Sequence, residues 1–478
     1  MPRFLDLLRT ELPERAVVTD PDLIEPWLVD WRGRYRGRAV ALVEPATTAE
    51  VVLAVRAAAA TATPLVPQGG NTGMVGGATP DAGGAAAILS LRRMNRIRSV
   101  DARANLAVAE AGVVLQRLND AALERGRRFP LTLGARGSAT VGGLVSTNAG
   151  GTQVLRFGTM RGLVAGVEAV MADGSVHNGL QALPKDNRGY SLDQLLIGAE
   201  GTLGVVTAAA LRLMPAVAAR GVAWAGVGSP AIAAELLRRL RERTDTIESF
   251  EILPHESLAA VLRHLPGSRA PLADDHPWHV LVEATAPDLH GEAPSALLER
   301  LLGEAMEAGM LADAAVAASE TQADAFWTIR DSISAAERAL GPATQHDISV
   351  APAAMPHFMV EAAAACEARF PGTRASGFGH LGDGNVHFHV RAPAGADPEG
   401  WYAGDAPVVT RFVHDLVTAA GGSISAEHGI GQMKLGELAR LLPPARARAM
   451  RAIKAALDPL GILNPGKLVP LAPGPDRQ

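Results

Sequence analysis

The chain has 478 residues, of which 48% are hydrophobic and 20% are charged, and its formal net charge at pH 7 is −5. This length exceeds what one hydrophobic core ordinarily supports, so two or more domains are expected. The mixed charges argue against a nucleic-acid surface or a polybasic membrane patch. The single cysteine, Cys366, excludes a disulfide framework and a thiolate metal cluster.

The N-terminal residues, Met1 to Glu11, mix charged and apolar side chains in a pattern that predicts an amphipathic helix. No apolar stretch typical of a secretion signal follows, and no uninterrupted apolar run reaches the length of a membrane span. We therefore expect a cytoplasmic protein with no transmembrane segment. Peripheral contact with a membrane and formation of a homodimer are left open.

Residues 1–215 are rich in glycine and in short apolar runs. A helix is expected over residues 49–60, where apolar residues follow a 3.6-residue period and Thr47 or Thr48 is a suitable N-cap. The Asp173-Gly174 pair predicts a tight turn that leads into a returning strand at Val176. Short apolar runs predict further strands at residues 39–43, 64–67, 86–89, 106–109 and 164–171.

After Met214-Pro215 the pattern changes, and longer helices alternate with strands. Helices are expected over residues 231–243 and 295–308, with a strand at 279–283, which is typical of a second, α+β domain. A last helix is expected over residues 445–458.

Four glycine-rich segments follow one another in the first half, at residues 67–77, 133–143, 146–151 and 197–206. Glycine lets successive backbone N–H groups turn inward and hold phosphate oxygens. The first segment is not a Walker A loop, because no Gly-Lys-Ser/Thr follows it, and its glycine spacing does not match a Rossmann fingerprint. Four such segments in order predict close approach of the backbone to a large, flat ligand.

These segments resemble the FAD-binding domain of the vanillyl-alcohol oxidase / p-cresol methylhydroxylase (PCMH) superfamily. Within it, the chain is similar to the FAD-linked D-2-hydroxyacid dehydrogenases, the group of D-2-hydroxyglutarate and D-lactate dehydrogenases. The resemblance implies an α+β protein. It would have a two-subdomain PCMH-type FAD-binding domain at 1–215 and a substrate (cap) domain with an antiparallel sheet at 216–440. Residues 441–478, with Asn-Pro-Gly-Lys, would return to the FAD domain.

The resemblance also implies which residues contact FAD. Neither histidine nor cysteine occurs in residues 67–77 or 133–151, so a non-covalent flavin is expected. The expected FAD-binding residues are Pro67, Gln68, Gly69, Gly70, Asn71, Thr72, Gly73, Gly134, Ser138, Gly142, Gly143, Thr147, Gly150, Glu200, Gly201, Val206, Asn464 and Lys467.

A dense histidine cluster lies in His380-Leu-Gly-Asp-Gly-Asn-Val-His387-Phe-His389, with Glu427-His428 downstream. Two imidazoles and a carboxylate form a typical site for a borderline divalent metal with open coordination positions. The family resemblance assigns metal to the same three residues, His380, His387 and Glu427. Zinc is the first choice, with manganese and iron as alternatives. A hydrogen-bonded core that pairs Glu427 with a histidine is the competing interpretation.

By the same resemblance, His428 is the general base, and its ordinary pKa near 6.5 suits that role. Arg330 is the candidate for gripping the substrate carboxylate, because a guanidinium matches a carboxylate in a bidentate fashion. Its alternative is an ion pair with Asp331 or Glu337. Ser334, one helical turn later, matches a substrate-contacting threonine of the hydroxyglutarate enzymes.

Two positions depart from the hydroxyglutarate pattern. Gln345 stands where those enzymes usually carry lysine, and His389 stands where they carry asparagine. His346 is a candidate to compensate for the lost cation. We expect Gln345 and His389 to contact substrate and to influence its choice, with a metal-ligand role for His389 as the alternative.

The leading hypothesis is oxidation of a D-2-hydroxy acid to the 2-keto acid by FAD and a divalent metal. No nicotinamide-binding or haem-attachment motif is present, so electrons are expected to pass to an electron-transfer flavoprotein, a quinone or a cytochrome. The alternatives are a flavoprotein subunit of a glycolate-oxidase-like complex and a metallohydrolase. The glycine segments argue against the metallohydrolase.

Overall fold

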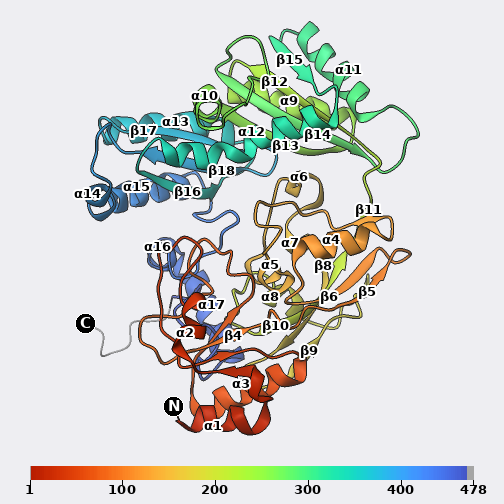
Figure 1. Cartoon of the computed structure of the whole chain (residues 1–478). Helices are drawn as coiled ribbons and strands as arrows, with labels where there is room; N and C mark the ends of the chain where they lie inside the picture. The colour runs from red at the N-terminus through yellow and green to blue at the C-terminus, as the bar shows by residue number, and fades with distance from the viewer. Residues whose placement is uncertain (1, 471–478) are drawn as a thin grey trace. The chain divides into compact units, whose positions relative to one another are not determined.

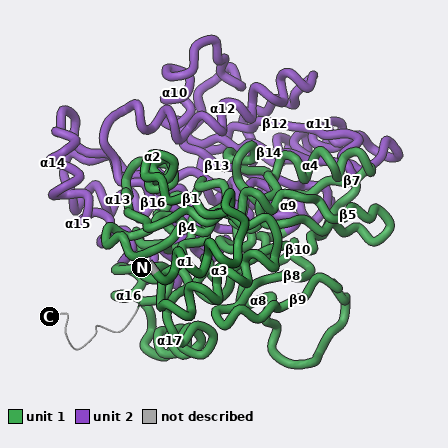
Figure 2. The backbone as a smooth tube through the Cα atoms, turned by 60° about the horizontal axis from the view of Figure 1, so that its bottom comes forward, with its two compact units in different colours: residues 1–150, 158–215, 427–478 green, residues 151–157, 216–426 purple. Residues whose placement is uncertain are grey.

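The computed structural model describes residues 2–470, apart from the side chain of Pro2. The chain divides into two compact units (Figures 1 and 2). Unit 1 comprises residues 1–150, 158–215 and 427–478, and unit 2 comprises residues 151–157 and 216–426. Among residues 2–470, no helix combines the length and apolar character that a membrane span requires.

Unit 1 contains two main sheets. A four-stranded sheet has the order β1-β2-β4-β3, in which β2, β4 and β3 run parallel. A five-stranded antiparallel sheet has the order β5-β6-β10-β8-β9, and β11 pairs with β7. The strands are β1 Val17–Val18, β2 Leu42–Val43, β3 Leu65–Gln68, β4 Ala87–Ser90, β5 Ile97–Asp101, β6 Leu106–Glu110, β7 Arg127–Arg128, β8 Val164–Val170, β9 Val176–Asn178, β10 Val205–Arg212 and β11 Met214–Pro215.

The helices of unit 1 cover these sheets. Phe4 and Leu8 of α1 pack with Val51 and Val55 of α3 against the buried strands of the four-stranded sheet. The helices are α1 Pro2–Glu11, η1 Glu14–Ala16, α2 Pro21–Ile24, η2 Glu25–Trp27, α3 Thr48–Thr61, α4 Leu115–Leu123, α5 Val141–Thr147, α7 Met160–Leu163, α8 Leu192–Leu196, α16 Leu435–Leu441 and α17 Pro444–Leu457.

Unit 2 is built on one seven-stranded antiparallel sheet with the order β15-β12-β14-β13-β17-β18-β16. Successive side chains point to opposite faces, so Ala223 joins one hydrophobic core and Trp224 the other. The strands are β12 Ala219–Val227, β13 Ile247–Pro254, β14 Trp278–Ala286, β15 Asp313–Val316, β16 Ala343–Ser349, β17 Arg374–His380 and β18 Asn385–Arg391.

Helices pack on both faces of this sheet. Apolar residues of α9, α11, α13 and α15 contribute to one core, and those of α10 and α12 to the other. The helices of unit 2 are α6 Val154–Phe157, α9 Pro230–Arg243, α10 His255–His264, α11 Pro294–Glu307, α12 Glu320–Ala339, α13 Met355–Arg369, α14 Pro398–Ala403 and α15 Asp405–Ala419.

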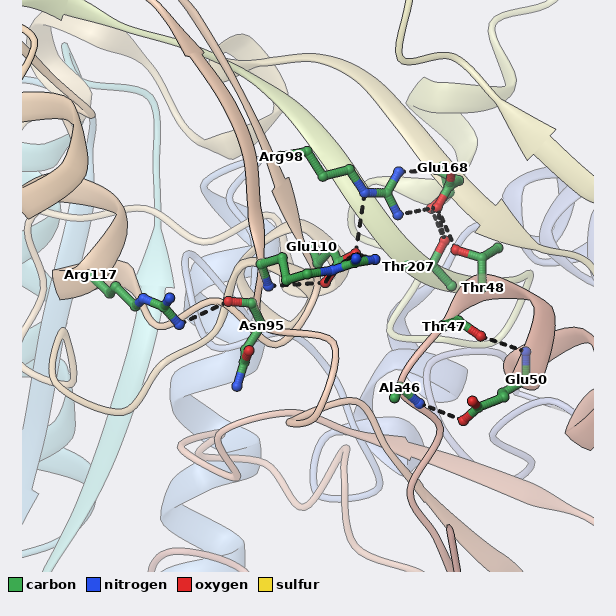
Figure 3. A network of polar contacts seen from close by, with 11 residues as sticks. Ala46, Thr47, Thr48, Glu50, Asn95, Arg98, Glu110, Arg117, Glu168 and Thr207 are labelled. Carbon is green, nitrogen blue, oxygen red and sulfur yellow. Dashed lines mark hydrogen bonds and ion pairs between the residues drawn. The ribbon is translucent and has the colours of Figure 1, made fainter. Parts of the chain in front are cut away.

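The expected elements are found with small shifts of their ends. The helix predicted at 49–60 is α3, and its N-cap is Thr47, whose hydroxyl accepts the N–H of Glu50 at 3.2 Å (Figure 3). The Glu50 carboxylate accepts the N–H of Ala46 in return, a second contact that fixes the entry to the helix. The strand expected at 39–43 is shorter, because its parallel ladder with β4 covers only Leu42 and Val43. The turn at Asp173-Gly174 joins β8 to β9.

A network of buried charge links strands of unit 1 (Figure 3). Arg98 of β5 binds both oxygens of Glu168 on β8, at 3.0 and 3.1 Å, and contacts Glu110 of β6 at 3.3 Å. Thr48 and Thr207 also donate to Glu168, at 2.7 and 2.8 Å. Burial by itself would raise the pKa of Glu168, but these hydrogen bonds outweigh burial and lower the pKa. The network therefore holds an ionised carboxylate inside the unit.

Replacing Arg98 by methionine should lower the free energy of unfolding of unit 1 by about 3 kcal/mol, because Glu168 stays buried without its cation. Urea denaturation followed by circular dichroism measures the change. The native pKa of Glu168 is depressed, so its contribution exists above pH ~4.5 and is lost as the pH falls further. The difference in the free energy of unfolding between the wild type and Arg98→Met should therefore become smaller below pH ~4.

Arg96→Met provides the matched control. Arg96 is exposed. In the variant its partner Glu110 would still accept hydrogen bonds from Arg98 and from the backbone N–H of residue 96. This substitution should lower the free energy of unfolding much less than Arg98→Met does, because exposed ion pairs contribute little to stability. Equal losses in the two variants would show that the Arg98–Glu168 pair does not stabilise unit 1.

Candidate active site

The first glycine loop of unit 1 follows β3 and packs tightly against the second glycine segment. A Cβ atom on Gly69 would lie 2.2 Å from the Thr140 hydroxyl oxygen, and one on Gly70 would lie 2.0 Å from the Ser138 carbonyl oxygen. Any side chain at these two positions would displace its neighbours, so only glycine fits. The two segments therefore pack directly against each other and form one wall.

Side chains at the ends of this loop fix its path. The Gln68 amide donates to the carbonyls of Trp27 and Ala78, at 3.1 and 2.8 Å. Asn71 has a positive φ of 54° and donates to the carbonyl of Val29 at 2.8 Å. Both amides are therefore used to shape the loop, whereas Gly73 has open space beside its Cα.

A cavity of about 330 Å³ lies against this wall of unit 1. It is lined by Gly70, Ser138 and Thr140, together with the guanidinium-bearing residues Arg92 and Arg117. Thr140 is 3% exposed, and within residues 2–470 its hydroxyl oxygen has no hydrogen-bonding partner. Glycine backbone, a buried hydroxyl and two guanidinium groups fit a ligand that carries phosphate groups. The residues present thus fit the diphosphate of a dinucleotide cofactor.

The other residues expected near FAD also lie in unit 1. Gly142, Gly143 and Thr147 are in α5, where a Cβ on Gly142 would lie 2.7 Å from Ala111. Thr72 and Gly134 lie in loops, and Gly150 is the last residue before the chain enters unit 2. Gly201 has a positive φ of 70°, and Val206 is buried in β10.

Glu200 has a role that the sequence did not indicate. Its carboxylate accepts the N–H groups of Ile430 and Gly431, both at 2.7 Å. Burial raises its pKa, and those two hydrogen bonds, together with the charges of Lys434 and Lys467, act in the opposite direction. Glu200 therefore fixes the segment directly after Glu427 and His428, in addition to its expected place along the cofactor.

The C-terminal segment is fixed to the same region. Asn464 donates to the carbonyls of Gly77 and Glu200, at 3.0 and 2.7 Å. Lys467 is buried, and this burial lowers its pKa. Lys454, whose role the sequence did not indicate, donates to the carbonyls of Thr202 and Leu463 at 2.7 and 2.8 Å. Its 252-residue separation from Thr202 left no signal in the sequence.

The two histidines of the expected metal set lie on one hairpin of unit 2. His380 ends β17 and His387 lies in β18, with register pairs His380–Asn385 and Phe378–His387. The turn needs Gly384, whose φ is 84° and whose Cβ would lie 2.0 Å from the carbonyl oxygen of Val350. The ring centroids of His380 and His387 are 5.5 Å apart. The turn therefore brings the two imidazoles together.

Glu427 directly follows Ala426, the last residue of unit 2, whose N–H donates to the carbonyl of Asp347 on β16 at 3.3 Å. One ligand atom each from His380, His387 and Glu427 lies within 4.8 Å of the others. Two imidazole nitrogens and one carboxylate oxygen at this spacing fit a divalent metal such as zinc. His428 is half-buried and comes next in the chain.

Arg330 on α12 and His380 share a buried partner that the sequence did not reveal. Glu251 of β13 accepts from His380 Nδ1 at 2.6 Å and from Arg330 Nε at 2.8 Å. Burial would raise the pKa of Glu251, but the charges of Arg330 and His380 outweigh burial and lower the pKa. Arg330 also lies 3.6 Å from Asp331, the partner considered from the sequence. Glu251 lies 79 residues from Arg330, so only the fold reveals the pair.

The expected substrate-contacting residues have different surroundings. His389 and His387 share a face of β18, and both rings contact Phe378, with centroids 5.3 and 5.2 Å away. His389 Nδ1 lies 4.0 Å from a carboxylate oxygen of Glu337 on α12. Gln345 pairs with His389 across the ladder and is half-buried. Ser334 is an exposed residue of α12.

His346 does not compensate for the missing lysine in the way the sequence suggested. It is adjacent to Gln345 in β16, so its side chain points to the opposite face of the sheet. Its ring packs edge-on against His414 of α15, with centroids 5.6 Å apart. The alternation of strand side chains therefore separates His346 from the face that carries Gln345 and His389.

Comparison with known proteins identifies two domain families in the chain. The FAD binding domain family matches residues 39–179, and the family of FAD linked oxidases, C-terminal domain, matches residues 217–468. Mitochondrial D-2-hydroxyglutarate dehydrogenase of Bos taurus is 37% identical over 98% of this chain and 83% of its own length. D-2-hydroxyglutarate dehydrogenase of Xanthomonas citri pv. viticola is 35% identical over 98% and 97%.

The solved structure of p-cresol methylhydroxylase with substrate bound superposes with a TM-score of 0.74, at 16% identity, over 98% of this chain and 96% of that one. At this identity the likeness concerns the fold. Fold and domain matches together define an FAD-linked oxidoreductase. The chain belongs to the family of FAD linked oxidases, and the relatives of 35–37% identity are D-2-hydroxyglutarate dehydrogenases. The fold class expected from the sequence is confirmed.

Proposed function

We propose that this protein oxidises a D-2-hydroxy acid to the 2-keto acid, with a non-covalent FAD as hydride acceptor and with a divalent metal. The observation that carries the proposal is the convergence of His380, His387 and Glu427, with His428 next in the chain. When bound, FAD supplies the hydride acceptor at N5 and the metal supplies Lewis acidity.

The chain's own residues supply binding and proton transfer. His428 takes the hydroxyl proton on a ring nitrogen, because neutral imidazole is a suitable base near neutral pH. Arg330 donates N–H groups to the substrate carboxylate. His380, His387 and Glu427 hold the metal, with zinc the first choice. Residues 1–215 bind FAD, residues 216–440 receive the substrate, and residues 441–478 complete the FAD domain.

Gln345, His389 and Ser334 contact the side chain of the substrate and select among D-2-hydroxy acids. The similar proteins are D-2-hydroxyglutarate dehydrogenases, so D-2-hydroxyglutarate is the first substrate to test. Gln345 is neutral and stands where the family resemblance implies a lysine, so a second carboxylate would meet one cation fewer. An acid with an uncharged side chain, such as D-lactate, is the natural alternative. An external electron acceptor, either an electron-transfer flavoprotein, a quinone or a cytochrome, then reoxidises the flavin.

Denaturation should release all of the yellow colour into the supernatant, because residues 67–77 and 133–151 contain no histidine or cysteine for tethering. Precipitation with acid, followed by absorbance of pellet and supernatant, measures the distribution. A yellow pellet after washing in denaturant would contradict non-covalent binding.

Anaerobic mixing with D-2-hydroxy acids should bleach the visible flavin absorbance, whereas the L-enantiomers should not. Prior treatment with EDTA should slow bleaching by at least about tenfold, and added zinc should restore it, because a metal held by His380, His387 and Glu427 would supply Lewis acidity to the substrate hydroxyl group. D-2-hydroxyglutarate, D-lactate and their L-forms make the panel. Bleaching by L-acids alone would overturn the proposed reaction, and insensitivity to EDTA would overturn the metal role.

His428→Asn should slow flavin reduction by about 10²- to 10⁴-fold, because asparagine cannot accept the hydroxyl proton. Stopped-flow reduction at saturating substrate measures this rate. His264→Asn, at an exposed position on α10, is the matched control and should reduce at the wild-type rate. FAD and zinc contents should be equal in all three proteins. Near-normal reduction of His428→Asn would assign the base to another residue.

A further inference from the structure

One buried carboxylate of unit 2 contacts both the expected metal ligand and the expected substrate arginine. Glu251 lies in β13, directly across the ladder from His380 in β17. Its side chain is 2% exposed, and those of His380 and Arg330 are 7% and 13% exposed. The three groups therefore interact in a region from which water is largely excluded, where hydrogen bonds orient side chains strongly.

The contact with His380 determines which ring nitrogen carries the proton. Arg330 can only donate, and it does so to Oε2 of Glu251 from both Nε and Nη2. This adjacent positive charge favours the ionised carboxylate, so Oε1 is an acceptor as well. His380 Nδ1, 2.6 Å from Glu251 Oε1, must then carry hydrogen. In neutral imidazole this leaves the lone pair on Nε2. A carboxylate that holds the far nitrogen of a metal-binding histidine fixes the ring and increases its basicity.

The contact with Arg330 determines where the guanidinium lies. Arg330 Nε and Nη2 lie 2.8 and 2.7 Å from Glu251 Oε2. Nη2 is also 3.3 Å from His380 Nε2, so the guanidinium lies beside the imidazole. Loss of the Glu251 charge would leave a cation in a poorly solvated place, and the arginine would be expected to move.

We infer that Glu251 is a positioning residue that orients His380 for metal binding and Arg330 for binding the substrate carboxylate. This inference rests on the proposed function, because it takes His380 as a metal ligand and Arg330 as a substrate contact. A purely structural ion pair is the competing explanation. It would make Glu251 important for stability, with no effect on metal affinity in the folded protein.

Glu248 provides a matched control on the same strand. Its side chain is fully buried, and it pairs with Arg156 at 2.9 Å and with the Thr285 hydroxyl. It thus has the same residue type, strand, burial and kind of partner as Glu251. Arg156 and Thr285 belong to α6 and β14, whereas the partners of Glu251 are His380 and Arg330. Glu248→Gln should therefore disturb stability to a similar extent while leaving the metal site as it is.

The experiment measures zinc affinity of FAD-loaded protein by competition with a chromogenic chelator. Wild type, Glu251→Gln, Glu248→Gln and His380→Ala are compared, with flavin content and urea midpoint as measures of folding. Glu251→Gln should bind zinc about 10- to 100-fold more weakly, with flavin content unchanged. Glu248→Gln should keep the wild-type affinity. The KM for the D-2-hydroxy acid under zinc saturation should rise about tenfold in Glu251→Gln and stay unchanged in Glu248→Gln.

Glu251→Asp keeps the charge and withdraws the carboxylate by one methylene. It should also weaken zinc binding, and it replaces Glu251→Gln if that variant lacks flavin. Wild-type zinc affinity in both Glu251 variants, with affinity lost in His380→Ala, would overturn the inference and leave the metal site intact. Equal zinc binding by wild type and His380→Ala would instead overturn the proposed metal site, and with it this inference.

Discussion

The hydrogen-bond register of β13, β17 and β18 decides which polar side chains of unit 2 meet. Glu251 is opposite His380, and the turn after His380 returns the chain so that Phe378 is opposite His387. Because strand side chains alternate between faces, a slip of one residue would turn His387 to the other side of the sheet. Gly384 is essential to this register, since its backbone has a positive φ and touches Val350. The metal-binding hypothesis therefore depends on backbone pairing before it depends on side-chain chemistry.

Several buried carboxylates of this protein hold neighbouring segments and side chains in place. Glu168 is held by a cation and two hydroxyl groups, and Glu251 by Arg330 and His380. Glu200 instead binds backbone N–H groups, and its pKa is raised rather than lowered. Burial outweighs these hydrogen bonds and the nearby lysine charges in Glu200, whereas the partners outweigh burial in Glu168 and Glu251. Each carboxylate joins segments that are far apart in the sequence.

The two positions expected to depart from the hydroxyglutarate enzymes, Gln345 and His389, share one face of β16 and β18. Gln345 and His389 are directly paired, so their two changes alter one surface. His389 lies close to Glu337 and Phe378, which couples its orientation to α12, the helix that carries Arg330 and Ser334.

The sequence by itself determined the family, the α+β class, the glycine-rich FAD-binding segments and the histidines of the candidate metal site. Those features depend on local rules: glycine where backbone approaches a neighbour, a period of 3.6 or 2, and ligand types at short spacing. It could not reveal the contacts of Glu251 and Lys454, or the hydrogen bonds that the N–H groups of residues 430 and 431 donate to Glu200. It also suggested a role for His346 that the opposite face of the strand excludes. Only the tertiary structure decided these points. The partners of these buried charged groups are tens to hundreds of residues away in the sequence, and strand register and the path of the chain bring them into contact.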